Sequence, residues 1–298
     1  MKSLWERLNL RGIKFRGLAF GPRKSKDLRF FIWFSVSSIA LLFLTFGALY
    51  LNYKFSSMVK TEERFVEKAK VVEKVSRMPE VAIILDDAGG RGPDYKEIFS
   101  IKEPLTISIM PNLKESEAVA LGALTSGKEV MLHLPMETYK DSYDRHDGSM
   151  ITINMSNDDI EKVVNSDIAA VFGASGVNNH MGSKATEDKR VMDEVLKIIK
   201  EKNLFFVDSR TSKKSVAFDE ARKMKIKSTE NNVFLDVEAN ADKIKEMMGK
   251  LVLEARKFGH AVGIAHVTRP VTIEMLKELM PYYEKNGIKF VFASEIVR

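Results

Sequence analysis

Acidic, imidazole and amide side chains gather at or directly after the short apolar runs of this sequence from Glu80 onward. Adjacent carboxylates together with several imidazoles are the usual composition of a metal site with acid and base partners. Each residue alone has an ordinary explanation, because an Asp pair often forms a turn and a lone His is more often structural. The prediction of a hydrolytic centre therefore depends on their joint occurrence. The clustered residues are Asp86, Asp87, His133, Asn178, Asn179, His180, Asp208, Arg210 and His266.

An alternation of short apolar runs and longer amphipathic runs begins at Glu80 and must position these residues. Strands that alternate with helices predict a mostly parallel sheet, either open or closed into a barrel. The carboxyl ends of such strands share one face, where we expect the polar clusters to meet. The strand candidates are 81–85, 105–110, 130–134, around 170–177, 204–207, 233–235, 261–265 and 289–292. The helix candidates are about 114–126, 157–166, 187–202, 214–224, 240–258 and 271–286.

A long uncharged segment, 30–53, precedes this region. About 20 apolar residues suffice to cross a bilayer, and Trp33 and Tyr50 stand near the two ends, as in interfacial aromatic belts. The basic residues of 1–29 predict a cytoplasmic tail, a single-pass inner- or plasma-membrane helix and an extracytoplasmic, periplasmic remainder. A cleaved signal peptide is the competing interpretation, which the length of the apolar run disfavours.

The net charge of +6 belongs to the tail 1–29, which carries nine basic and two acidic side chains. A basic flank beside a membrane segment explains this charge, so the sequence gives no reason to expect a nucleic-acid partner. Residues 54–79 are dense in charge and have apolar residues at helical spacing, which predicts a juxtamembrane helix or stalk. This stalk could associate with a copy of itself, but its pattern is too short to establish a coiled coil.

The segments AIILDDAG, HLPME, GVNNHMGS and FFVDSRTS, and the IAH before TRPVTIEML, resemble the divergent polysaccharide deacetylase family. That family is distantly similar to the NodB-type carbohydrate esterases, and the resemblance covers residues 80–298. It implies a distorted (β/α) barrel of the NodB-like deacetylase type, preceded here by one transmembrane helix. The implied activity is metal-dependent hydrolysis of acetyl groups from a cell-envelope polysaccharide.

The same resemblance implies a role for each residue of the centre. Asp87, His133 and His180 correspond to the metal ligands, and zinc suits two imidazoles and one carboxylate best. Since the chain has no Cys, no thiolate competes for this role. Iron, cobalt and nickel accept the same residue types, so the sequence leaves the identity of the divalent metal open.

Three further residues correspond to the acid–base machinery of the family. Asp86 matches the base, which an adjacent cation would keep ionised, and His266 matches the general acid. Asp208 is expected to orient or tune one of these groups. Asn178, Asn179 or backbone N–H groups could contribute oxyanion donors. Arg210 could pair with Asp208 or bind an acidic sugar.

Two departures from the NodB-like pattern are visible. That pattern places both metal-binding His residues on one motif, whereas here the second, His180, must come from a different strand end. The sequence also has no Arg-x-Pro-Tyr segment. The residues that form the substrate groove in the NodB-like enzymes therefore cannot be assigned to positions of this chain. His146 is expected to be exposed to solvent, and His260, which precedes its strand, to lie on the opposite face.

Two other functions remain open. A non-catalytic envelope protein would keep the barrel and use its groove to bind glycan or to act as a scaffold. A metal-dependent phosphatase is the second alternative. The polar clusters offer few cations to hold a phosphate group, chiefly Arg210 and Lys184, in addition to helix N-termini.

Overall fold

The computed structural model describes residues 25–76, 78–139 and 150–298. Contacts between residues divide the chain into two compact units, Met1–Val72 and Glu73–Arg298. The predicted basic tail therefore lies mostly outside the described residues, as does His146. The two units are described in turn.

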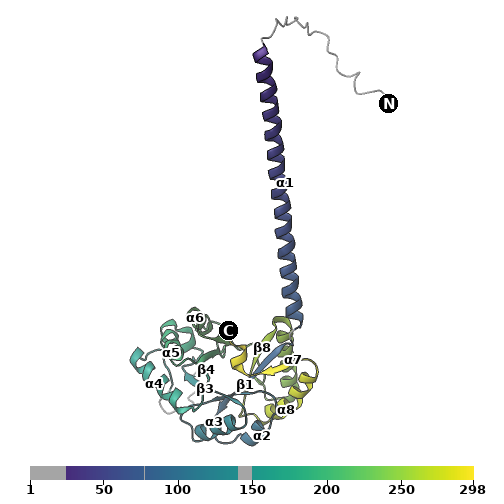
Figure 1. The fold of residues 1–298 in the computed structure, drawn as a ribbon. Helices are drawn as coiled ribbons and strands as arrows, with labels where there is room; N and C mark the ends of the chain where they lie inside the picture. Colours follow the sequence, from purple (N-terminus) through teal and green to yellow (C-terminus); the bar gives the residue numbers. More distant parts are fainter. Residues whose placement is uncertain (1–24, 77, 140–149) are drawn as a thin grey trace, which may run out of the picture. The chain divides into compact units, whose positions relative to one another are not determined.

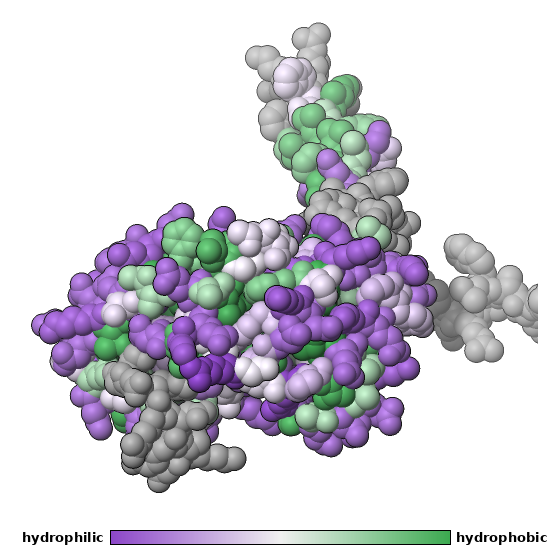
Figure 2. Space-filling view, turned by 90° about the horizontal axis from the view of Figure 1, so that it is seen from below, coloured by the Kyte–Doolittle hydropathy of each residue, from purple (hydrophilic) through white to green (hydrophobic). Residues whose placement is uncertain are grey.

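The first unit is dominated by α1 (Ser25–Ser76), a continuous helix of 52 residues. Its segment Ile32–Arg64 is long and apolar enough to cross a membrane, with a mean hydropathy of 2.0 in its most apolar window. Side chains such as Trp33 and Phe43 are about three-quarters exposed. Figure 2 shows such apolar side chains on the helix, whereas the surface of the second unit is largely hydrophilic. The predicted apolar segment and the predicted stalk are thus parts of one helix.

The second unit is a parallel sheet with helices around its outside (Figure 1). The strands are β1 (Glu80–Ala88), β2 (Thr106–Ile109), β3 (Glu129–Met136), β4 (Gly176–Met181), β5 (Phe205–Asp208), β6 (Ser228–Glu230), β7 (Val233–Phe234), β8 (His260–His266) and β9 (Lys289–Val291). The helices are α2 (Tyr95–Phe99), α3 (Ser116–Thr125), α4 (Asn157–Ala170), α5 (Lys189–Glu201), α6 (Ala217–Lys223), α7 (Ala241–Phe258), α8 (Pro270–Lys285) and α9 (Ala293–Ile296), with a short 3₁₀ turn at Ala185–Glu187.

The strand order is β6-β5-β4-β3-β2-β1-β8-β7, and β9 pairs with the first residues of β1. The two outermost strands, β6 and β7, follow each other in sequence with only Asn231 and Asn232 between them. The backbone N–H of Asn231 donates to Asp208 O on β5, and that of Asn232 donates to Val262 O on β8. This short link holds the two edges of the curled sheet near each other. The expected distorted (β/α) barrel is thus confirmed in the form of a curled half-barrel.

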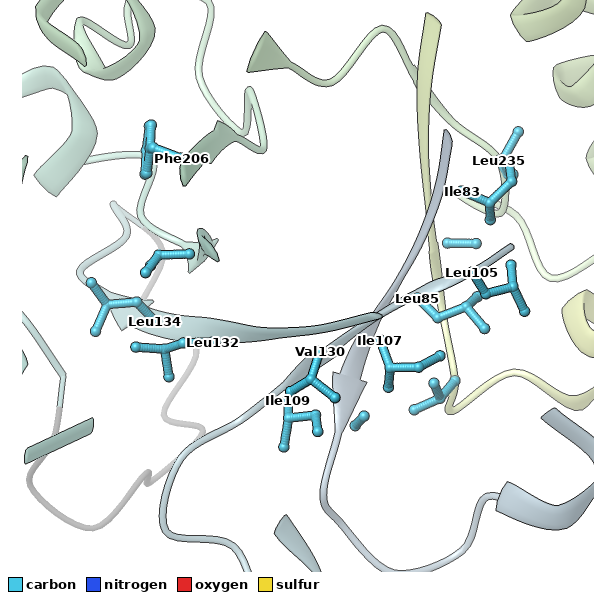
Figure 3. Close-up of a cluster of buried hydrophobic side chains, with 14 of the residues drawn as sticks. Ile83, Leu85, Leu105, Ile107, Ile109, Val130, Leu132, Leu134, Phe206 and Leu235 are labelled. Carbon is cyan, nitrogen blue, oxygen red and sulfur yellow. The ribbon is translucent and has the colours of Figure 1, made fainter. Parts of the chain in front are cut away.

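Side-chain alternation along the strands separates two apolar layers. Odd residues of β1, such as Ile83 and Leu85, pack outward against the helices in the larger core cluster, some members of which are labelled in Figure 3. Even residues, such as Ala82 and Ile84, face the interior of the barrel in a smaller cluster. The interior is thus filled with apolar side chains near the beginnings of the strands.

The C-terminal segment closes this end of the interior. Ala293, Ile296 and Val297 belong to the interior cluster, and the backbone N–H of Ala293 donates to the Thr106 hydroxyl at 3.0 Å. Toward the carboxyl ends of the strands, the interior positions become polar. The polar side chains of the predicted site therefore lie at that end of the barrel interior.

The expected helices and strands are present. The differences concern one strand boundary and several short elements. The strand expected around 170–177 begins only at Gly176, because α4 continues to Ala170. The sequence did not indicate β6, α2 or α9, each of which has five residues or fewer. Such short elements depend on tertiary contacts more than on local sequence.

Candidate metal and acid–base centre

The end of β1 brings two consecutive carboxylates to the mouth of the barrel. Asp86 continues the interior face of Ala82 and Ile84, and it is 2% exposed. Alternation alone would turn Asp87 outward. Instead, the register between β1 and β2 shifts between Leu85 and Ala88, and Asp87 has a φ of +64°. A left-handed conformation is unfavourable for a non-glycine residue and is often found at functional sites.

The Asp87 carboxylate lies between two imidazoles from neighbouring strands. Asp87 Oδ1 is 3.0 Å from His180 Nδ1 and 3.3 Å from His133 Nε2. The two ring nitrogens are 3.1 Å apart. Tetrahedral zinc with bonds of about 2.0–2.1 Å would hold its ligand atoms about 3.3 Å apart. The three donor atoms therefore have the spacing that a single cation requires, and they form the metal-type group found among the described residues.

A second observation supports this fit. Asp87 Oδ1 is buried and accepts no well-aligned hydrogen bond within the described part of the chain. A buried carboxylate oxygen without such a bond is costly, and a cation between the three donor atoms would remove that cost. The Asp87 side chain as a whole is 27% exposed, which leaves one side of the group accessible.

Asn178 on β4 connects the metal-type group to Asp86. Its Oδ1 accepts from the Ser108 hydroxyl at 2.5 Å and lies 2.7 Å from His133 Nδ1. Its Nδ2 donates to Asp86 Oδ1 at 2.9 Å. Because Nδ1 of His133 faces an acceptor, it must carry the proton, and the lone pair of Nε2 then points to Asp87 and His180. Such outer contacts commonly fix the tautomer of metal-binding His residues.

Burial and the neighbouring charges set the protonation of this group. Burial raises the pKa of the Asp86 carboxyl above its usual range, and the His133 imidazole only partly opposes this effect. For Asp87, burial also acts to raise the pKa, but the His133 and His180 imidazoles beside it outweigh this effect and lower the pKa far below the usual range. Burial acts to lower the pKa of His133, and the Asp86 and Asp87 carboxylates raise it overall.

His266 ends β8 at the position that pairs with Asp86 in the register of β1 and β8. Its Nδ1 is 2.8 Å from Oδ1 of Asp236, and its backbone N–H donates to Oδ2 of the same residue at 2.9 Å. Asp236 is fully buried and also accepts from the Thr272 hydroxyl. Burial acts to lower the pKa of His266, but the bond to Asp236 raises it overall.

Asp236 is a residue that the sequence analysis missed. It follows β7 in the segment VFLD, so it carries the same signal as the other acids, a carboxylate directly after an apolar run. The run is short, and β7 itself has only two residues. The ring of Phe234 stacks on that of His266 at 6.4 Å between centroids, which further fixes the imidazole.

Asp208 was expected to orient or tune a group of the centre, but its contacts lie elsewhere. Phe206 on β5 faces the outer helices, and alternation places Asp208 on the same side. Its carboxylate accepts from the Ser215 hydroxyl at 2.7 Å and from the backbone N–H groups of Arg210 and Phe218. The residue in contact with His266 is therefore Asp236.

The remaining polar residues of the prediction have structural contacts. Arg210 pairs with Glu230, and its Nε lies 3.9 Å from Asp208. Asn178 and Asn179 are buried, and Asn179 Nδ2 donates to Met181 O while its Oδ1 accepts from Ser209 N. Their amide N–H groups are thus engaged within the protein, which does not favour the expected oxyanion role. His260 begins β8, at the opposite end from His266, as expected.

Together these features define an α/β half-barrel with a histidine–carboxylate centre at the carboxyl ends of its strands. A model of the divergent polysaccharide deacetylase family matches residues 83–297. The chain is 30% identical over 217 residues to the uncharacterized protein YibQ of Escherichia coli strain K12, covering 73% of this chain and 67% of YibQ. This protein belongs to the divergent polysaccharide deacetylase family.

Two further comparisons found similar proteins. An uncharacterized protein of Haemophilus influenzae is 32% identical over 197 residues, which cover 66% of this chain and 69% of that protein. The crystal structure of uncharacterized protein ATU2773 from Agrobacterium tumefaciens C58 matches with a TM-score of 0.71 and 20% identity. That match covers 74% of this chain and 90% of ATU2773, and it shows a shared fold.

Proposed function

We propose that the barrel hydrolyses acetyl groups from a carbohydrate with the aid of one divalent metal ion. The observation that carries this proposal is the convergence of Asp87, His133 and His180 to within 3.3 Å of one another. Membership in the deacetylase family makes acetylated carbohydrate the substrate class to consider first.

Asp87, His133 and His180 would hold the metal, and zinc is the ion that two imidazoles and one carboxylate suit best. When bound, the ion supplies Lewis acidity, which lowers the pKa of water and polarises a carbonyl group. Three protein ligands are the usual number in catalytic zinc sites, which keep a position for water or substrate. The Asp87 side chain is 27% exposed, which is consistent with access for water or substrate.

Asp86 would accept the proton of the attacking water. Its Oδ1 is occupied by the bond from Asn178, whereas Oδ2 lies 3.6 Å from His133 Nε2 and therefore faces the metal-type group. Oδ2 is thus the atom placed to take up the proton. A carboxylate whose pKa is raised by burial is a better base near neutral pH than an ordinary one.

His266 would donate a proton to the leaving amine or alkoxide. Its Nδ1 is held by Asp236, so Nε2 is the nitrogen that can exchange a proton with the substrate. The raised pKa keeps a larger fraction of the imidazole protonated at neutral pH. His266 pairs with Asp86 in the register of β1 and β8, which supports a proton donor beside the proposed base.

The long apolar helix suggests where this reaction takes place. We propose that α1 anchors the protein in the inner or plasma membrane, with the basic tail in the cytoplasm and the barrel on the periplasmic side. Fusion of a reporter that is active only in the cytoplasm or only outside it, after residue 298, would test this orientation.

Acetate release by the full-length chain loaded with zinc tests the activity. The substrates are N-acetylated and O-acetylated oligosaccharides of the cell envelope, and the matched control is the Asp86→Asn variant. The proposal expects release by the wild type and background rates in the variant. A chain that binds zinc but releases no acetate from any of these sugars would instead support the non-catalytic alternative, a glycan-binding or scaffold barrel.

A further inference from the structure

A cavity of about 350 Å³ lies at the amino ends of β4, β5 and β6. Its walls are formed by the residues that enter these strands, by Lys200 of α5 and by the C-terminal segment. The histidine–carboxylate centre lies at the carboxyl ends of the strands. This cavity is therefore on the opposite face of the barrel and takes no part in the proposed hydrolysis.

Backbone hydrogen bonds hold the walls of this cavity together. The backbone N–H of Phe205 donates to Ser175 O at 3.2 Å, and β5 pairs with β6. The C-terminal segment is joined to β6, because Ser228 and Arg298 exchange backbone hydrogen bonds of 3.2 and 3.3 Å. The shape of the cavity is therefore set by the sheet and does not depend on a single loop.

The charged residues that line the cavity are all basic. Lys200, Lys225 and Lys227 are exposed there, and Asn203 adds an amide group. No carboxylate side chain of the described residues belongs to the lining. Glu295, which follows a lining residue in the C-terminal segment, accepts a backbone hydrogen bond at the start of α9 instead. Three positive charges thus surround the cavity without a negative charge in its lining.

The three ammonium groups are not used by the protein itself. A lysine near the end of a helix can bond the last carbonyl groups or offset the helix dipole. Here backbone N–H groups bond those carbonyls, since Leu204 N donates to Ile199 O after α5 and Ile226 N donates to Ala221 O after α6. None of the three ammonium groups forms a hydrogen bond or ion pair with another described residue. They are therefore available to a ligand.

The size and the floor of the cavity indicate what kind of anion fits. Phe205, Ile226 and Val297 are buried and supply apolar surface beneath the lysines. Lysine is a common ligand of phosphate, on which it acts as a point charge, and a phosphate monoester carries about −1.5 to −2 charges at pH 7. Because one water molecule occupies about 30 Å³ in the liquid, the cavity has room for about twelve. A bare phosphate ion would leave much of this space empty, so a phosphate joined to an organic part fits better.

We propose that this cavity binds the phosphate group of an organic phosphate, either a soluble molecule or a phospholipid headgroup. Lys200, Lys225 and Lys227 bind the phosphate oxygens, and the apolar floor packs against the organic part. The two sources carry the same group, and the experiment separates them. Since the cavity is distinct from the histidine–carboxylate centre, the inference does not rest on the proposed deacetylase function.

Calorimetric titration of the full-length chain in maltoside micelles, which contain no phosphate, tests the proposal. Glycerol phosphate represents the soluble source, and dihexanoylphosphatidylglycerol represents the lipid source. Glycerate is the ligand control, because it keeps the short hydroxylated carbon chain but carries a carboxylate in place of the phosphate.

The variants remove positive charge from the cavity. Lys225→Gln/Lys227→Gln removes two of the three charges, and Lys200→Glu is a second variant on a different wall. The matched control is Lys245→Gln/Lys285→Gln, which makes the same change of charge at exposed lysines of α7 and α8, outside the cavity. Substitutions at exposed positions change stability little, and circular dichroism checks that each variant keeps its fold.

We expect the wild type to bind at least one of the two phosphate probes. Its Kd for that probe should rise at least about tenfold in Lys225→Gln/Lys227→Gln and in Lys200→Glu, because each variant loses hydrogen bonds to a charged group. The control variant should keep the wild-type Kd. Binding of glycerol phosphate would identify a soluble ligand, and binding of the phospholipid alone would identify a headgroup; either result supports the site.

Three results would overturn the inference. The first is that the wild type binds neither phosphate probe. The second is that glycerate binds as tightly as the phosphate probes, since the cavity would then not distinguish phosphate from carboxylate. The third is that the cavity variants and the control variant lose the same affinity, which would show a general effect of net charge.

Discussion

The ends of β1 and β5 look alike in sequence but differ in the contacts of their aspartates. Each ends a buried strand with an aspartate, in AIILDD and FFVD, and each aspartate is followed by small or polar residues. At β5, hydrogen bonds from Ser215, Arg210 N and Phe218 N occupy the Asp208 carboxylate. At β1, Asp87 Oδ1 is buried between two imidazole nitrogens with no well-aligned hydrogen bond in the described residues.

The difference shows how a functional polar cluster can be distinguished from a structural one. A structural cluster pairs its donors and acceptors within the protein, as buried polar groups generally do. A candidate centre brings several acceptors of the same kind together and leaves them to an ion or a substrate. The following variants test this contrast, in order of decreasing expected effect.

Loss of either imidazole at the β1 end should have the largest effect. His133→Ala and His180→Ala each remove one of the three proposed metal ligands, so the proposed release of acetate should fall to the background rate. His260→Ala, a substitution of the same residue type at the opposite end of β8, should keep the wild-type rate. If His133→Ala and His260→Ala behaved alike, the metal assignment would have to be abandoned.

His266→Ala should lower turnover by about 10²–10⁴-fold, the usual contribution of a general acid. Zinc content should stay at the wild-type level, because His266 belongs to the acid side of the centre and not to the metal-type group. Steady-state kinetics together with elemental analysis of the purified variant would check both statements. Full turnover in this variant would exclude His266 from the mechanism.

Asn178→Ala should weaken zinc binding by about 10–100-fold, as is typical when an outer contact of a metal ligand is lost. The variant removes the acceptor that fixes the tautomer of His133 and also frees Asp86 Oδ1. Ser108→Ala, which removes only one bond to the same amide, should have a smaller effect. Competition with a zinc chelator measures the affinities, and equal values for Asn178→Ala and the wild type would refute the role of Asn178.

Asp236→Asn should shift the pH dependence more than the maximal rate. Asp236 raises the pKa of His266, and a general acid is active only below its pKa. The alkaline limb of the pH–rate profile should therefore move to lower pH in the variant, since the neutral amide no longer stabilises the imidazolium. An alkaline limb that stays at the same pH would show that another group supplies the proton.

Asp208→Ala should change stability and leave the metal in place. The substitution leaves the Ser215 hydroxyl and two backbone N–H groups without their buried acceptor, which should cost about 1–3 kcal/mol of unfolding free energy. Denaturant unfolding and elemental analysis separate the two effects. Loss of zinc from a folded Asp208→Ala protein would mean that the β5 end contributes to the centre after all.

The sequence was sufficient to predict most of the architecture and the core of the centre. Long amphipathic segments such as 240–258 and apolar runs such as 81–85 identify their elements because their periodicity is strong. The convergence of Asp87, His133 and His180 follows from the rule that parallel strands end on one face. These three residues meet as expected, while their metal-binding role remains to be tested.

Other features of the fold and of the candidate site depend on tertiary contacts, which the local sequence does not reveal. The irregular register that turns Asp87 inward is a tertiary feature, because it involves the pairing of β1 with β2. The strict alternation of β5 could have indicated that Asp208 faces outward with Phe206, yet the exact extent of a four-residue strand is hard to fix from sequence. Asp236 was missed although a strand at 233–235 was expected, because a single Asp followed by Val237 does not form a cluster of polar residues.

The central claim is that one divalent ion binds between Asp87, His133 and His180. Titration of the metal-free, full-length protein with Co²⁺, followed by visible absorption, tests it most directly because the spectrum reports both stoichiometry and ligand geometry. We expect one equivalent per chain with the spectrum of a low-coordinate nitrogen–oxygen site, and no such signal in His133→Ala or His180→Ala. A wild-type protein that binds no Co²⁺ there, or variants that bind it as the wild type does, would contradict it.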